Sequence, residues 1–304
     1  MIDMIETRAP IETPIHPIIS RRSPGRIVRR TVIRFCTVYL PTILLILFVI
    51  TPFLWMLLGS FKTNIELMSS QGQTLWIKEP TLDNYVRLFH DYPFARFFLN
   101  STIVATGTTM IAVSFSAFAG YSLSRFSFPG RTVIGVAFLV TQMLPGVAIL
   151  IALYIQFRDF GLLNNYAGLI IGYNAFSIPF CTWMLRGFFD SIPRELEEAA
   201  LIDGCNRVTS FFSVALPLTL PGLLATGIFA FILAWHEFVF AVTMINDTKM
   251  FTLTVGIASM KSINIIDWGL LNAGVVVTTI PLVILFAFVQ RYLIQGLTAG
   301  AVKG

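Results

Sequence analysis

Acidic and small side chains gather in one short segment of this chain, between two long apolar stretches. The segment contains Glu195, Glu197, Glu198, Ala199, Ala200, Asp203 and Gly204. Carboxylates in such a segment can pair with groups on another surface, and the small residues allow that surface to approach closely. The chemistry that these residue types indicate is docking against a partner rather than the making or breaking of bonds.

The same segment is predicted to form a short helix. Ser191 and Pro193 are typical of a helix start, the glutamates place negative charge near the positive end of the helix dipole, and Gly204 supplies a left-handed stop. A helix of about 12 residues would extend about 18 Å, which is too short to cross a bilayer. Because residues four apart share a helix face, Ala200 and Gly204 would form a small face that fits a groove.

Glu237 is a second candidate because it lies in a long apolar stretch. A carboxylate inside a membrane is costly and marks a candidate functional site, where it could accept hydrogen bonds along a substrate path. The alternative is an acid that is hydrogen-bonded to a neighbouring helix, and the sequence leaves both open. The adjacent His236 points about 100° away on a helix. With no second His or Cys nearby, it predicts no metal site.

The composition indicates which elements must position these residues. The chain has 304 residues, of which 56% are hydrophobic and 12% charged, against about 25% charged in soluble domains. Its long charge-free stretches exceed the roughly 20 residues that cross a bilayer, and backbone groups in lipid must pair within the segment, so the stretches are helices. We predict an all-α polytopic protein with six spans at 36–59, 97–121, 132–156, 163–186, 218–243 and 268–291.

Features within the spans predict how they pack. Prolines inside four of them predict bends, which neighbouring helices or water must satisfy; they are Pro52, Pro145, Pro179 and Pro281. Small residues recur in the second span and allow close approach of another helix; they are Ser114, Ser116, Ala117, Ala119 and Gly120.

Basic residues predict the orientation. An inside N-terminus assigns fourteen Lys and Arg to the cytoplasmic side and seven to the other side, as the positive-inside rule requires. Both termini are then cytoplasmic. The net charge of +5 reflects this bias and contact with anionic membrane lipid, and no nucleic-acid partner is predicted. Residues 1–30 mix proline and charge and are predicted to be a mobile leader, whereas residues 31–304 form one membrane domain.

The polar segment carries a more specific pattern. Glu198-Ala199-Ala200 is followed after two residues by Asp203-Gly204, and Leu216-Pro217 comes twelve residues after the glycine. This pattern resembles the cytoplasmic EAA loop of ABC-importer permeases. Over roughly residues 35–304 the chain is similar to maltose-type carbohydrate permeases, in particular the smaller partner of the permease pair. Supporting stretches are 235–238, 251–256, 267–269, 290–292 and 296–304, and His236 departs from the Asn that is common in that family.

The resemblance implies a permease subunit of an ATP-driven, binding-protein-dependent importer of type I-like fold, for a sugar, oligosaccharide or sugar derivative. In that family the loop is a coupling helix that enters a cleft on the ATPase. The residues that the resemblance assigns to coupling are Glu195, Glu198, Ala199, Ala200, Asp203 and Gly204. It also implies a second homologous permease, two ATPase copies, an extracytoplasmic substrate-binding protein and a place in the bacterial inner membrane.

Nucleotide chemistry is expected on a separate subunit. No Lys directly follows a Gly in this chain, so it has no P-loop that could cradle nucleotide phosphates. ATP and Mg would bind the partner ATPase. The chain itself is predicted to be no enzyme and to hold no cofactor or metal.

Residues 250–260 form an apolar run that is too short to span a bilayer. By resemblance, this external segment faces the substrate-binding protein, through Phe251, Thr252 and Thr254. The alternative is a loop that packs over the helix bundle.

Two other functional classes remain open from the sequence. An ion-coupled secondary transporter would normally contain more buried ionisable groups and paired repeats. A membrane-embedded enzyme would need several convergent reactive side chains at membrane depth, and only the neighbourhood of Glu237 offers any.

Overall fold

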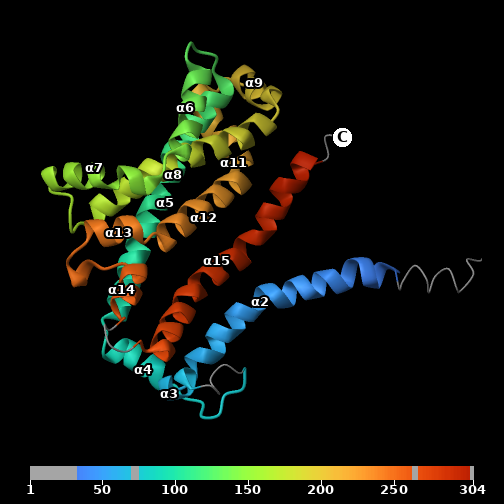
Figure 1. Cartoon of the computed structure of the whole chain (residues 1–304). Coiled ribbons are helices and arrows are strands. Elements are labelled where there is room, and N and C mark those ends of the chain that lie inside the picture. Colours follow the sequence, from blue (N-terminus) through green and yellow to red (C-terminus); the bar gives the residue numbers. More distant parts are fainter. Residues whose placement is uncertain (1–32, 70–74, 262–265, 302–304) are drawn as a thin grey trace, which may run out of the picture. The chain divides into compact units, whose positions relative to one another are not determined.

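A computed structural model describes residues 33–69, 75–261 and 266–301. The predicted leader, residues 1–30, lies outside the described residues. Every regular element within them is helical (Figure 1), which confirms the all-α prediction. The chain divides into two compact units, Met1–Leu54 and Trp55–Gly304.

The first described helical segment begins with a π-helical turn, Phe35–Tyr39, and continues as α2 (Leu40–Ser60), which ends in the second unit. The other helices are α3 (Asn64–Met68), α4 (Asp83–His90), α5 (Phe94–Arg125), α6 (Arg131–Met143), α7 (Gly146–Asp159), α8 (Tyr166–Ser191), α9 (Arg194–Ile202), α10 (Arg207–Ser210), α11 (Leu216–Leu218), α12 (Leu220–His236), α13 (Val239–Met244), α14 (Leu253–Ser259) and α15 (Trp268–Ala301). A π-helical turn, Phe211–Ala215, joins α10 to α11, and a 3-10 turn, Thr248–Met250, precedes α14.

Four described helical segments are long and apolar enough to cross a membrane. They are Phe35–Ser60, Phe94–Arg125, Tyr166–Ser191 and Trp268–Gln290. Two bent helix pairs would bring the count to six if each pair is one span. The prediction of six spans therefore agrees with the upper count.

The predicted third span is not one continuous helix. It is divided into α6 and α7, which are bent relative to each other by 97°. Pro145 separates them, because a residue before proline is pushed out of the helical region, and Leu144 is extended with a ψ of 126°. The predicted bend at Pro145 is confirmed, whereas a single helix over 132–156 is wrong.

The predicted fifth span, 218–243, is also divided. A bend of 75° separates the segment Arg207–Leu218 from α12, because Pro221 has no N–H to donate to the carbonyl four residues earlier. At the other end α12 stops at His236, and Glu237 is extended with a ψ of 130° before α13 begins. With 17 residues, α12 is therefore shorter than the predicted span.

In the second unit, α5 packs lengthwise against α8 and α12, and α12 packs against α15. Ser116, Ala117 and Gly120 are buried in α5, and a Cβ added at Gly120 would lie 3.0 Å from the backbone nitrogen of Arg186. The hydroxyl of Thr182 donates to that of Ser116 at 3.2 Å. These contacts confirm that small residues of the second span allow close helix packing.

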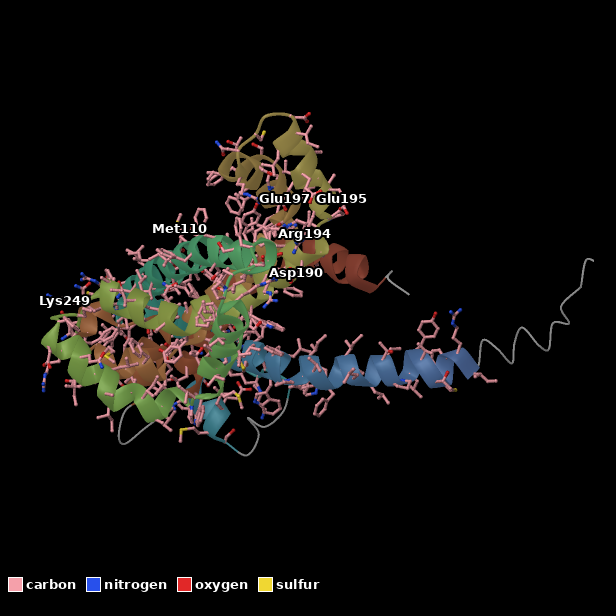
Figure 2. All side chains as sticks on the ribbon, turned by 90° about the horizontal axis from the view of Figure 1, so that it is seen from above. Met110, Asp190, Arg194, Glu195, Glu197 and Lys249 are labelled. Carbon is pink, nitrogen blue, oxygen red and sulfur yellow. The ribbon has the colours of Figure 1, made fainter. Side chains whose placement is uncertain are left out.

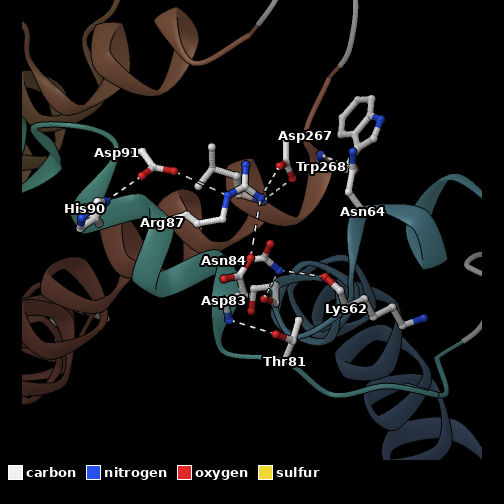
Figure 3. Close-up of polar contacts among 12 residues, drawn as sticks. Lys62, Asn64, Thr81, Asp83, Asn84, Arg87, His90, Asp91, Asp267 and Trp268 are labelled. Carbon is white, nitrogen blue, oxygen red and sulfur yellow. Dashed lines mark hydrogen bonds and ion pairs between the residues drawn. The ribbon is translucent and has the colours of Figure 1, made fainter.

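Polar contacts join three elements near the beginning of α15 (Figure 3). The Asn84 amide donates to the carbonyls of Ser60 at 2.9 Å and Lys62 at 2.8 Å, which satisfies backbone groups at the end of α2. Arg87 on α4 pairs with Asp267, with 2.8 Å between Nη1 and Oδ2. The hydrogen bond with Asp267 is the main cause that raises the pKa of Arg87. This cluster fixes α4 against α15.

Candidate functional sites

The predicted docking segment and the external apolar segment lie at opposite ends of the second unit. In Figure 1, α9 is at one end and α14 towards the other. Figure 2 shows Asp190, Arg194, Glu195 and Glu197 together at one end, while Lys249 lies far from them. A long helix, α5, extends between the two regions.

The start of α9 differs from the prediction. The helix has nine residues, Arg194–Ile202, and its N-cap is Pro193, which makes no side-chain cap. Ser191 belongs to α8, and its hydroxyl donates to the Phe188 carbonyl at 2.7 Å. The boundary lies between the two residues because Ile192, which precedes a proline, is extended. Ser191 as the cap of this helix is therefore wrong.

The end of α9 confirms the prediction for Gly204. Its φ is +94°, a left-handed conformation that glycine adopts without strain. The Gly204 N–H donates to the Leu201 carbonyl at 3.2 Å, and the Cys205 N–H donates to the Ala200 carbonyl at 3.0 Å. This pair of bonds is the Schellman arrangement, and it turns the chain sharply towards α10.

One face of α9 and its C-terminal turn is exposed. It contains five of the six residues predicted for docking, namely Glu195, Glu198, Ala199, Asp203 and Gly204, while Ala200 is half-buried. Apolar side chains accompany them, with Ile202 at 86% exposed and Leu196 also exposed. Exposed apolar side chains within a rim of acids and small residues are typical of a surface that a protein partner covers.

The opposite face of α9 is anchored by Glu197, which the sequence indicated only as a charge on the helix dipole. Its Oε1 accepts from Arg125 Nε at 2.6 Å, and its Oε2 accepts from the Tyr121 hydroxyl at 2.7 Å. The two charged side chains are only 10% and 6% exposed. No spacing in the sequence indicates this pair, because Arg125 lies 72 residues earlier.

The C-terminus of α5 is tied to both neighbouring elements. Arg125 also donates from Nη2 to the Ile192 carbonyl at 3.0 Å, in the connection between α8 and α9. The Ser124 hydroxyl donates to Asp190 Oδ1 at 2.6 Å, and Arg194 donates to the Ser124 carbonyl at 3.0 Å. The ends of α5 and α8 and the start of α9 therefore form one hydrogen-bonded group.

Glu237 does not lie inside a helix, contrary to the prediction. Its carboxylate accepts from the backbone N–H of Phe240 at 2.8 Å and of Ala241 at 2.9 Å. It also accepts from the Tyr173 hydroxyl at 3.0 Å. A side-chain acceptor placed before the first turn caps a helix, so Glu237, one residue before the N-cap Phe238, caps α13, which begins at Val239. His236, the last residue of α12, is exposed.

Glu237 also borders a cavity of about 310 Å³. The walls come from α7, α8, α12 and α13, and they are largely apolar. Tyr173, Phe176 and Phe240 contribute aromatic rings, and Ser177 contributes a hydroxyl-bearing side chain. Both interpretations of Glu237 therefore remain, since its carboxylate caps a helix and the residue lines a cavity.

The external segment is packed against the bundle. Thr252 is 3% exposed, and its hydroxyl lies 3.1 Å from that of Thr254. The Thr254 hydroxyl donates to the Glu237 carbonyl at 2.7 Å. Phe251 is half-buried beside Phe97, with 6.1 Å between ring centroids. Of the three predicted contact residues, the structure therefore places Thr252 out of reach of a partner.

Fold and site together define a class of protein, a helical membrane protein with a short exposed helix at one end of its bundle. The chain belongs to the family of binding-protein-dependent transport system inner membrane components, whose model matches residues 112–299. It is accordingly a membrane-embedded permease subunit of an ABC importer and not an enzyme.

Relatives cover most of the chain. It is 38% identical to the sulfoquinovosyl glycerol transport system permease protein SmoH of Agrobacterium fabrum, over 83% of this chain and 88% of that protein. It is 35% identical to the trehalose/maltose transport system permease protein MalG of Thermococcus litoralis, over 91% and 100%. A chain of a bacterial ABC transporter involved in alginate import has the same fold, with a TM-score of 0.72 at 22% identity over 92% of this chain and 99% of that one.

Proposed function

We propose that this permease imports a carbohydrate and that α9 receives the movement of a separate ATPase subunit. The names of its relatives support a sugar as cargo, since they include permeases for trehalose/maltose, diacetylchitobiose and maltodextrin. The observation that carries the coupling role is the exposed face of α9, in which acids and small residues surround Ile202.

The proposed assembly contains this chain, a second homologous permease, two ATPase copies and an extracytoplasmic substrate-binding protein. ATP and Mg bind the ATPase subunits. ATP binding closes these subunits and moves α9, and the bent helices then switch the path between inward-facing and outward-facing states. The coupling contact is made by Glu195, Glu198, Ala199, Ala200, Asp203 and Gly204.

For the substrate path, we propose the cavity beside Glu237 and the neighbouring His236. Aromatic rings pack against the apolar faces of a sugar, and a carboxylate accepts hydrogen bonds from its hydroxyls. On the external side, half-buried Phe251 and Thr254 remain candidates for contact with the binding protein. Residues 246–249 lie beside them and are exposed, so we add this turn to the proposed contact.

The proposal is tested by uptake into proteoliposomes that contain both permeases, the ATPase and the binding protein. We expect maltose or trehalose to accumulate only with ATP inside and binding protein outside. An ion gradient without ATP should give no accumulation. Uptake driven by the gradient alone would instead indicate the ion-coupled alternative.

For the orientation, we propose that both termini and α9 are cytoplasmic. The distribution of basic residues supports this assignment, and α9 and Lys249 lie at opposite ends of the second unit (Figure 2).

Cysteine labelling will test the orientation, in a chain whose own cysteines are replaced at 36, 181 and 205. Thr248 and Ile202 are both exposed, so accessibility within the chain does not bias the comparison. We expect Thr248→Cys to react with an impermeant thiol reagent from outside, because Thr248 is next to Lys249, which lies at the opposite end of the bundle from α9 (Figure 2). Ile202→Cys, in membranes from which the ATPase has been removed, should react only after the membrane is opened. The reverse pattern would contradict both the orientation and the coupling role of α9.

A further inference from the structure

We propose that the buried contact of Glu197 with Arg125 and Tyr121 is the positioning element that passes movement of α9 into the membrane helices. This inference rests on the proposed coupling function of α9. It concerns a different face of the helix from the one that docks. Adjacent residues of a helix point about 100° apart, and Glu198 is exposed while Glu197 is buried.

Both carboxylate oxygens of Glu197 are engaged by α5. The Arg125 contact measures 2.6 Å and the Tyr121 contact 2.7 Å, distances typical of charge-assisted bonds. Removing one partner of a buried pair leaves an uncompensated charge, which is strongly destabilising. Displacement of α9 away from the end of α5 would have the same consequence, so the two elements should move together.

Arg125 also holds the chain that leads into α9. Its Nη2 donates to the Ile192 carbonyl, and only Ile192 and Pro193 separate α8 from α9. Arg125, the last residue of α5, therefore bonds both α9 and the connection before it through one guanidinium group. This arrangement restricts the movement of α9 relative to α5 that a two-residue connection would otherwise allow.

Tyr121 extends the link into the core of the bundle. Its ring lies 5.4 Å from that of Phe189 on α8 and 4.7 Å from that of Phe211 in the π-helical turn, measured between centroids. The Tyr121 side chain thus donates a hydrogen bond to α9, and its ring packs against both α8 and the π-helical turn. Movement of α9 is therefore transmitted through close contacts to α5, to α8 and to the π-helical turn that precedes α11 and α12.

The test is the Glu197→Gln variant in the complete transporter, with uptake and ATP hydrolysis measured on the same proteoliposomes. We expect sugar transported per ATP hydrolysed to fall about tenfold, within the range of measured coupling between sites. The matched control is Asp159→Asn, which removes a carboxylate from an exposed pair with Arg158 at 2.9 Å. The control should leave the ratio unchanged.

The ratio separates positioning from mere stability. A purely structural role would reduce the amount of assembled complex and leave sugar transported per ATP unchanged, and that result would overturn the inference. If Glu197→Gln does not assemble, Tyr121→Phe decides, because it keeps the ring packing and removes only the hydroxyl. An unchanged ratio in Tyr121→Phe would then contradict the link. Failure of the wild-type complex to couple uptake to ATP would instead contradict the proposed function.

Discussion

Ala199→Trp is expected to weaken ATPase association and sugar uptake strongly while the chain still inserts into the membrane. Ala199 is exposed on the predicted docking face of α9, so a large side chain meets the partner rather than the chain's own core. Overpacking a close contact costs about 1–3 kcal/mol, which corresponds to roughly a 5- to 150-fold loss of affinity. Co-purification of the ATPase and uptake into vesicles measure the effect.

A graded series at the same position supplies the control. Ala199→Ser nearly preserves side-chain volume and should retain both association and uptake. Ala199→Leu should give an intermediate loss of association and uptake, although leucine is among the best helix formers. If loss followed helix propensity rather than volume, the defect would lie in α9 itself. Normal association of the Trp variant would exclude this face as the docking surface.

Glu237→Leu is expected to reduce strongly the amount of assembled transporter. Two backbone N–H groups, of Phe240 and Ala241, and the Tyr173 hydroxyl would lose their acceptor. A buried polar group without a partner costs about 1–3 kcal/mol, so we expect the first turn of α13 to be destabilised. The measurement is the yield of intact complex after extraction, together with uptake per amount of complex.

Two variants distinguish the cap from a role in the substrate path. Glu237→Gln retains a single acceptor oxygen, so we expect an intermediate yield. Tyr173→Phe leaves the two bonds to the backbone of α13 in place and removes only the hydroxyl beside the cavity. Reduced uptake with normal yield in Tyr173→Phe would support the substrate path. A normal yield of Glu237→Leu would contradict the cap, and full uptake would remove Glu237 from the candidate site.

Helix type and approximate place were predictable because lipid leaves the backbone few alternatives. A long apolar stretch in a bilayer must satisfy its N–H and C=O groups internally, so composition alone determined an all-helical membrane chain. Local chemistry also predicted the stop of α9, since Gly204 with a φ of +94° needs no long-range contact. The bend at Pro145 follows in the same way from the restriction that proline places on the residue before it.

Contacts between distant residues were not predictable in this way. The division of the fifth span depends partly on Glu237, whose carboxylate takes two backbone N–H groups that a continuous helix would have used. Thr252 and Thr254 matched a family pattern, yet the burial of Thr252 follows from packing of α14 against α5.

By itself, the sequence determined a polytopic helical membrane protein with a short polar helix bounded by Pro193 and Gly204, because hydropathy and turn chemistry act over a few residues. Only the tertiary structure decided which face of that helix is free and which is held. Glu197 and Glu198 are neighbours of the same chemical type, and Arg125 and Tyr121 bury one and leave the other exposed. The reason is physical: burial and charge pairing depend on the distance between side chains in space, and residues 72 positions apart meet only once the helices have packed.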